Sequence, residues 1–255
     1  MKIGLALSGG GIKGIAHIGT LKAINEQGIK IDQISGTSAG AIVGALYAAG
    51  HSWEDILEFF TQTSVFDISK FAYGKPGFID TIKFEKDLRH YLPDNSFEKL
   101  NIPLTITATE IKSGKLKVFQ QGELIQPILA SFAFPGVLTP IEIDGTFYFD
   151  GGVIDDFPVE YLMDSCDYII GSYANPLTAI SIASLEHSYK VLNRAFEINL
   201  HHRAHKKFHN CDILICPQDL SHYTTFSIRN INNIFELGYR EAHQQLLHFK
   251  NKLEY

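Results

Sequence analysis

The sequence predicts an α/β protein whose mostly parallel sheet is covered by helices on both faces. Short apolar segments recur along the 255 residues, and longer segments with helical periodicity lie between them. Glycine-rich turns follow the first two apolar segments, as expected where a strand leads into a helix. This alternation is typical of parallel sheets, because each crossover between parallel strands requires a connecting helix.

The first part of the chain predicts two strand-to-helix units followed by a further helix. Residues 3–7 are an apolar run that ends in three glycines, and residues 31–35 are a second run that ends in a Gly-Thr-Ser-Ala-Gly segment. Helices are expected over residues 12–28, where Ile and Leu recur every three positions, and over residues 38–49. A capping-box pattern at residues 52–55 predicts the start of the next helix.

Residues 64–84 interrupt this alternation. They are rich in Phe, Tyr, Gly and Pro and have no clear period, which predicts an ordered connection or a lid. Four aromatic residues of this stretch either line an acyl groove or pack in the core: Phe66, Phe71, Tyr73 and Phe78.

The remaining elements alternate again, and two of the turns between them are hairpin signals. We expect a helix over residues 84–92, followed by two pairs of strands, over 104–109 and 116–119 and over 141–143 and 146–149. Two further strands are expected over 168–173 and 213–215, with a long helix between them that ends near 209. A last helix is expected over 229–253. No repeat or linker separates them, so a single domain over residues 1–255 is expected.

Composition excludes several classes of function. The chain has 22 Lys and Arg against 28 Asp and Glu, a net charge of -6, which argues against nucleic acid as a partner because phosphate backbones attract clustered cations. Three cysteines, Cys166, Cys211 and Cys216, include no CxxC pair, so neither a disulfide framework nor a zinc site is expected, and the three are interpreted as buried small side chains. No signal peptide or run of 18 apolar residues is found, which predicts a cytoplasmic protein.

Gly36-Thr37-Ser38-Ala39-Gly40 matches the pattern Gly-x-Ser-x-Gly between an expected strand and an expected helix. A sharp turn at this point presents the serine at the carboxyl edge of the sheet, and the glycines avoid clashes in the crowded turn. The helix dipole that begins at Ser38 favours a developing negative charge. The alternative is a glycine-rich helix start that only packs closely against the sheet.

Gly9-Gly10-Gly11-Ile12-Lys13-Gly14 forms a glycine loop ahead of a helix, where successive amides bind anions. The segment also matches Gly-x-Gly-x-x-Gly, but a dinucleotide site needs an acidic residue at the end of the second strand, which here ends in Ser35-Gly36. An oxyanion hole for acyl transfer fits better. A tight turn without function remains the other interpretation.

Asp150-Gly151-Gly152 follows the second expected hairpin. An aspartate at a strand end beside two glycines can present its carboxylate in a narrow site, although Asp-Gly is also common in ordinary turns. With the ordinary aspartate pKa of about 3.9, Asp150 would be a weak base for a serine hydroxyl.

The order and spacing of these three motifs, with Ala130-Ser131-x-Ala133-x-Pro135 between the last two, resemble the patatin-like phospholipase family over roughly residues 3–175, and most closely its short bacterial members. The resemblance implies a three-layer α/β/α fold and a calcium-independent Ser-Asp dyad without cofactor or metal. It assigns Ser38 as nucleophile and Asp150 as general base. The implied oxyanion hole consists of Gly9, Gly10 and Gly11, and the supporting motif residues are Lys13, Gly14, Gly36, Gly40, Gly151 and Gly152.

Two positions depart from the family pattern. Lys13 stands where arginine is commoner, and Asp155 and Asp156 stand where asparagines are commoner before a proline, here Pro158. If either aspartate lies near Asp150, repulsion between like charges should raise the pKa of the base.

The resemblance implies hydrolysis of acyl esters in phospholipids or lysophospholipids through a covalent acyl-serine. A soluble short-chain esterase or thioesterase and a lipid-sensing protein with negligible turnover remain alternatives, and peripheral contact with a membrane remains open. Head group, chain length, positional preference and oligomeric state are not encoded in recognisable form.

No histidine is expected to act as the base. His17 is expected to brace the first helix against a neighbouring strand. His201, His205 and His209 have a spacing that can ligate zinc, but no carboxylate or cysteine completes a set, so a solvated helix face is expected.

Overall fold

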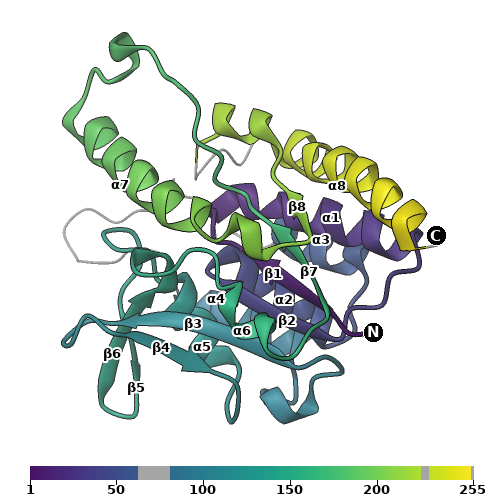
Figure 1. Cartoon of the computed structure of the whole chain (residues 1–255). Helices are drawn as coiled ribbons and strands as arrows, with labels where there is room; N and C mark the ends of the chain where they lie inside the picture. Colours follow the sequence, from purple (N-terminus) through teal and green to yellow (C-terminus); the bar gives the residue numbers. More distant parts are fainter. Residues whose placement is uncertain (63–80, 225–229, 254–255) are drawn as a thin grey trace.

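In the computed structural model, which describes residues 1–62, 81–224 and 230–253, eight strands form one sheet between two layers of helices (Figure 1). The strands are β1 (Ile3–Leu7), β2 (Gln33–Thr37), β3 (Leu104–Glu110), β4 (Leu116–Phe119), β5 (Ile141–Ile143), β6 (Thr146–Asp150), β7 (Tyr168–Ser172) and β8 (Ile213–Ile215). The helices are α1 (Ile15–Glu26), α2 (Ala39–Ala48), α3 (Trp53–Gln62), α4 (Thr81–Tyr91), α5 (Ile125–Phe132), α6 (Glu160–Met163), α7 (Ser188–His205) and α8 (Ile231–Leu253). The predicted α/β/α class is confirmed.

The sheet is mixed, with its parallel strands together. Strand order is β5-β6-β3-β2-β1-β7-β8, and β4 also pairs with β3. The five strands from β3 to β8 along this order run parallel, whereas β4, β5 and β6 pair antiparallel. The carboxyl ends of β1 and β2 therefore lie side by side. The carboxyl end of the antiparallel strand β6 pairs with β3, which is the neighbour of β2.

Buried hydrophobic side chains form three clusters, and the two larger ones cover opposite faces of the parallel strands. Leu5 and Leu7 of β1 point into the larger core, which α1, α2, α3, α5 and α8 cover, and Ala6 points to the opposite face. There Phe157, Leu162 and Ala204 pack beneath α6 and α7. The two layers of helices thus bury both faces of the parallel strands, as parallel sheets require.

Two glycines let α1 and α8 approach each other closely. A methyl group at Gly19 of α1 would meet the backbone of Phe235, and one at Gly238 of α8 would meet the backbone of Ala16. The C-terminal helix therefore packs directly on the helix that follows the glycine loop.

Several element boundaries differ from the sequence predictions. The first helix begins at Ile15, after a 3-10 turn (η1) over Gly11–Gly14. Strand β2 spans Gln33–Thr37 and ends two residues later than expected, because Thr37 still pairs with Thr107 of β3. Helices α5 and α6 were not predicted. In α5, Pro127 obscures the helical pattern, but it lies in the first turn, where its missing amide hydrogen breaks no helical hydrogen bond.

Other predictions have clear outcomes. Ser52 and Asp55 form the expected capping box, with the Asp55 amide donating to Ser52 Oγ at 3.1 Å and the Ser52 amide to Asp55 Oδ2 at 3.0 Å.

The three cysteines are unpaired, but they are half-buried rather than buried because they flank the core under α6 and α7. Most of the proposed lid, including its four aromatic residues, lies outside the described residues. Among the described helices, none is long and apolar enough to cross a membrane.

Candidate active site

Ser38 occupies a strained turn between β2 and α2. Its φ is 55° and its ψ is -122°, a region that residues other than glycine rarely adopt. A methyl group at Gly36 would lie 2.5 Å from the carbonyl oxygen of Gly40, and one at Gly40 would meet the backbone of Leu7. The glycines of the Gly-x-Ser-x-Gly pattern are therefore a steric requirement of this turn.

The side chains of Ser38 and Asp150 lie together although 112 residues separate them. Ser38 Oγ donates a hydrogen bond to Asp150 Oδ2 at 2.6 Å, and the Gly152 amide donates to Asp150 Oδ1 at 2.8 Å. Asp150 is the last residue of β6, directly opposite Ala108 of β3, and β3 is the neighbour of β2. A methyl group at Gly151 would lie 2.5 Å from the Thr107 carbonyl oxygen, so the close contact of this loop with β3 also requires glycine.

Burial changes the acid-base properties of Asp150. Its side chain is almost inaccessible, and this desolvation raises its pKa to about 7 against the opposing hydrogen bonds from Ser38 and Gly152. The nearby carboxylate of Asp156 raises the pKa further. An ordinary aspartate pKa was the wrong premise for this residue, because the sequence does not show how completely water is excluded.

The glycine loop passes directly beside Ser38. A methyl group at Gly9 would lie 3.3 Å from Cβ of Ser38 and would collide with the Asp156 side chain, and one at Gly14 would lie 2.5 Å from Cβ of Ala39. Gly11 has a φ of 58°, which places its backbone in the left-handed region that favours glycine. The loop is thus packed tightly against the start of α2.

One predicted oxyanion donor needs correction. The Gly9 amide donates a 3.0 Å hydrogen bond to the Asp156 carbonyl oxygen, which occupies its only hydrogen. Gly9 therefore serves as a point of attachment between the glycine loop and the loop after β6, and the amides of Gly10 and Gly11 remain as the candidate donors.

Lys13 and Asp156 are both buried near the glycine loop and interact electrostatically. Lys13 is only 4% exposed, and burial lowers its pKa while Glu197 and Asp156 oppose that shift. Burial raises the pKa of Asp156 to about 6, although Asn175 Nδ2 donates to its carboxylate at 2.9 Å. Of the two aspartates that depart from the family pattern, Asp156 is the one that acts on Asp150.

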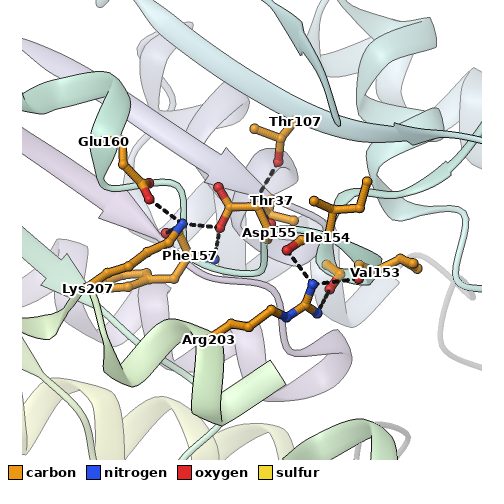
Figure 2. Close-up of polar contacts among 10 residues, drawn as sticks. Thr37, Thr107, Val153, Ile154, Asp155, Phe157, Glu160, Arg203 and Lys207 are labelled. Carbon is orange, nitrogen blue, oxygen red and sulfur yellow. Dashed lines mark hydrogen bonds and ion pairs between the residues drawn. The ribbon is translucent and has the colours of Figure 1, made fainter. Parts of the chain in front are cut away.

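Figure 2 shows how the loop after β6 is held by Arg203 near the end of α7 and by Lys207 just after it. Arg203 donates to three successive carbonyl oxygens, those of Gly152, Val153 and Ile154 at 3.1, 2.8 and 2.5 Å. Lys207 pairs with Asp155 at 2.5 Å.

The same lysine contacts Glu160 at 2.6 Å, so it joins the loop to α6. Sequence reasoning missed Arg203 and Lys207, since no local pattern links them to a loop some 50 residues earlier. We call these two residues the α7 clamp.

Of the histidines considered from the sequence, His17 has a clear structural role. His17 is buried and bridges Ser172 Oγ at 2.8 Å and the Ser8 carbonyl oxygen at 2.9 Å, so the predicted bracing of α1 is confirmed. Burial lowers the pKa of His17 to about 4, which leaves it neutral at pH 7. His205 and His209 are exposed as expected, whereas His201 is half-buried because it packs against Tyr173. In the described part of the chain, no three metal-ligating side chains are grouped.

Comparisons with known proteins place this site in context. Residues 5–163 match the family model described as patatin-like phospholipase. An uncharacterised NTE family protein of Mycobacterium tuberculosis is 37% identical over 163 residues, which cover 62% of this chain and 44% of that protein. Lysophospholipase NTE1 of Kluyveromyces lactis is 25% identical over 99% of this chain and 20% of its own length. This chain therefore spans less than half of either relative.

The fold also matches a solved structure. VipD from Legionella pneumophila superimposes with a TM-score of 0.58 at 15% identity, covering 96% of this chain and 66% of that one. At this identity the likeness shows a shared fold. The region matched by the family model ends before α7, so the α7 clamp lies outside it.

Proposed function

Because this chain belongs to the patatin-like phospholipase family, we propose that it hydrolyses acyl esters of phospholipids or lysophospholipids through a Ser38-Asp150 dyad. The observation that carries the proposal is the 2.6 Å hydrogen bond from Ser38 Oγ to Asp150 Oδ2. A carboxylate whose pKa is about 7 accepts a serine proton far more readily than an ordinary aspartate does.

In the first half-reaction Ser38 Oγ attacks the ester carbonyl carbon while its proton passes to Asp150 Oδ2. The negative charge moves to the carbonyl oxygen, where the amides of Gly10 and Gly11 and the N-terminus of α2 stabilise it. One such donor is typically worth roughly 3 to 4 kcal/mol. Collapse of the tetrahedral intermediate breaks the ester bond, and Asp150 returns the proton to the departing alcohol.

In the second half-reaction water attacks the acyl-serine with Asp150 again as base. The fatty acid leaves, Ser38 regains its proton from Asp150, and the dyad is restored. The raised pKa of Asp150 suits both roles, since the group must gain and release a proton near neutral pH.

Labelling with a fluorophosphonate tests the dyad. We expect an adduct on the peptide that contains Ser38, no adduct in Ser38→Ala, and labelling at least about 10²-fold slower in Asp150→Asn. The matched control is Ser113→Ala, which alters an exposed serine in the turn between β3 and β4. Equal labelling of Ser38→Ala and wild type would exclude Ser38 as the nucleophile.

A lipid extract incubated with wild type and with Ser38→Ala distinguishes the alternatives. Mass spectrometry should show loss of phospholipids or lysophospholipids and release of fatty acids with wild type alone. Preference for short-chain soluble esters in an acyl-length series would favour the esterase, and lipid binding without turnover would favour the lipid sensor.

A further inference from the structure

The peptide unit that joins Gly9 to Gly10 carries one of the two candidate oxyanion donors. Its carbonyl oxygen belongs to Gly9 and its N–H belongs to Gly10. Because this peptide is trans and planar, the carbonyl and the N–H point in opposite directions. Whatever holds the Gly9 carbonyl oxygen on one side of the loop therefore holds the Gly10 N–H on the other side.

Glycine on both sides of this peptide unit removes the local barriers to its rotation. Glycine adopts positive and negative φ about equally, so sterics alone do not keep a Gly-Gly peptide from flipping. The loop nevertheless requires glycine here, since Gly10 has a φ of 155° and a methyl group on it would lie 3.0 Å from Cβ of Ala174. The orientation of the peptide must therefore be set by hydrogen bonds.

Two side chains hold the Gly9 carbonyl oxygen. Asn175 Nδ2 donates to it at 3.1 Å, and Ser8 Oγ donates to it at 2.8 Å. Ser8 Oγ in turn accepts from the Ala174 amide at 2.9 Å, so both donors are tied to the segment that follows β7. Since β7 is the parallel neighbour of β1, this segment and the glycine loop leave the same edge of the sheet side by side.

Asn175 also joins the glycine loop to the loop that follows Asp150. Its Nδ2 donates a second hydrogen to Asp156 Oδ2 at 2.9 Å, and the Asp156 carbonyl oxygen accepts from the Gly9 amide at 3.0 Å. Gly9, Asn175 and Asp156 thus form a closed ring of three hydrogen bonds. Asn175 is half-buried, and Pro176 after it restricts its backbone, which limits the positions that its side chain can take.

We propose that Asn175 is a positioning residue of the oxyanion hole, which fixes the direction of the Gly10 N–H by holding the Gly9 carbonyl oxygen. It acts through the peptide plane and not through contact with the substrate. The inference rests on the proposed hydrolysis, because the Gly10 N–H acts as a donor only if an oxyanion forms beside Ser38. Without Asn175, Ser8 alone holds the carbonyl oxygen, so the loss should stay below the roughly 10²- to 10³-fold effect of a missing donor.

Steady-state hydrolysis of a soluble ester at about pH 8.5 compares Asn175→Ala and Asn175→Leu with wild type. Leucine keeps the approximate size of the asparagine side chain and removes its donors. At this pH, which is above the pKa of Asp150, a changed titration of the buried carboxylates contributes little. In both variants kcat should fall about ten- to hundredfold and KM should change less than about twofold, because the oxyanion exists only in the transition state.

The matched control is Asn101→Ala. Asn101 Nδ2 also donates to a backbone carbonyl oxygen at 3.1 Å, that of Ala49, at the end of α2 opposite to Ser38. The loss of this hydrogen bond should leave kcat and KM unchanged.

An alkyl trifluoromethyl ketone reports on the oxyanion hole directly. Ser38 Oγ adds to its carbonyl carbon, the serine proton passes to Asp150, and the ketone oxygen takes the negative charge. The inhibition constant should rise in both Asn175 variants by about the factor that kcat/KM falls. It does not depend on the fraction of active protein, so partial unfolding cannot imitate the effect. The affinity of the matching ether, which forms no oxyanion, should stay within about twofold.

Thermal unfolding of each variant verifies that it is folded. Unchanged kcat/KM and an unchanged inhibition constant in both Asn175 variants would overturn the inference. An equal loss in Asn101→Ala, or an equal loss of ether affinity, would overturn it as well. Failure of the proposed function gives a different result, because the ketone would then inhibit wild type and Ser38→Ala equally or not at all, and the inference would fall with it.

Discussion

Asp150 combines a short hydrogen bond to Ser38 with nearly complete burial. The hydrogen bond favours the carboxylate, but the loss of water outweighs it and raises the pKa of Asp150 to about 7. The base of the proposed dyad is therefore half protonated at neutral pH. The activity of the free enzyme should rise with pH up to about 7, because only the carboxylate form can accept the Ser38 proton.

Asp156 gives a test of this interpretation. Its carboxylate lies in the same buried region and raises the pKa of Asp150, while Lys13 and Arg203 partly balance its charge. Asp156→Asn removes that charge and should move the acidic limb of the kcat/KM profile to lower pH. The measurement is the pH dependence of hydrolysis of a soluble ester.

Asp155→Asn is the matched control for this prediction. Asp155 pairs with Lys207 and is not among the groups that shift Asp150, so its removal should leave the acidic limb in place. A limb that shifts equally in both variants, or in neither, would contradict the assigned role of Asp156.

At the scale of elements, the site depends on contacts between segments that are distant in sequence. Strands β2 and β6 bring Ser38 and Asp150 together through β3, and α7 holds the loop that follows β6. Thr37 of β2 adds a hydrogen bond to this loop, since its Oγ1 donates to the Asp155 carbonyl oxygen at 3.1 Å. The loop is thus attached on the strand side and on the helix side.

Arg203→Ala should lower kcat about ten- to hundredfold with little change in KM, since three carbonyl oxygens lose their donor and Asp150 loses its fixed position. Steady-state kinetics on a soluble ester measure this split. Millimolar guanidinium should restore part of the lost kcat by occupying the vacated position. Arg240→Ala, which alters an exposed arginine of α8, is the control and should retain both parameters.

A general loss of structure would produce a different result. It would lower the fraction of active protein, which guanidinium cannot restore, and it would lower the midpoint of thermal unfolding in proportion. If Arg203→Ala keeps the kcat of wild type, the clamp does not position the base.

For the whole molecule, the buried carboxylate carries a cost in stability. The folded-state pKa of Asp150 lies above the unfolded value of about 3.9, so the stability that its protonated form provides is lost as pH rises from about 4 to about 7. A shift of this size corresponds to at most about 4 kcal/mol, because one pKa unit is about 1.4 kcal/mol.

Asp150→Asn should therefore be inactive and yet more stable than wild type at pH 8, by up to about 4 kcal/mol, with a smaller difference at pH 5. Urea denaturation at the two pH values measures this. The control is Asp94→Asn, a change at an exposed carboxylate, which should have little effect. Equal stabilities of Asp150→Asn and wild type at pH 8 would contradict the assigned burial cost.

The sequence alone was sufficient for the features that depend on short-range sterics. A strand followed by three glycines, and Gly-x-Ser-x-Gly between a strand and a helix, each predict a turn that only small residues allow, and the structure has both turns. The hairpin that ends at Asp150 and most strands follow from apolar runs and turn residues in the same way. These features are encoded locally because the atoms that clash or bond lie within a few residues of one another.

Only the tertiary structure decided the properties that depend on residues far apart in the sequence. The pKa of Asp150, the use of the Gly9 amide, the different roles of Asp155 and Asp156, and the α7 clamp all depend on which segments meet at one edge of the sheet. Burial and electrostatic interactions act through space, so residues 50 to 150 positions apart determine them together. A local pattern therefore identifies the proposed nucleophile and base, but only the folded chain sets their chemistry.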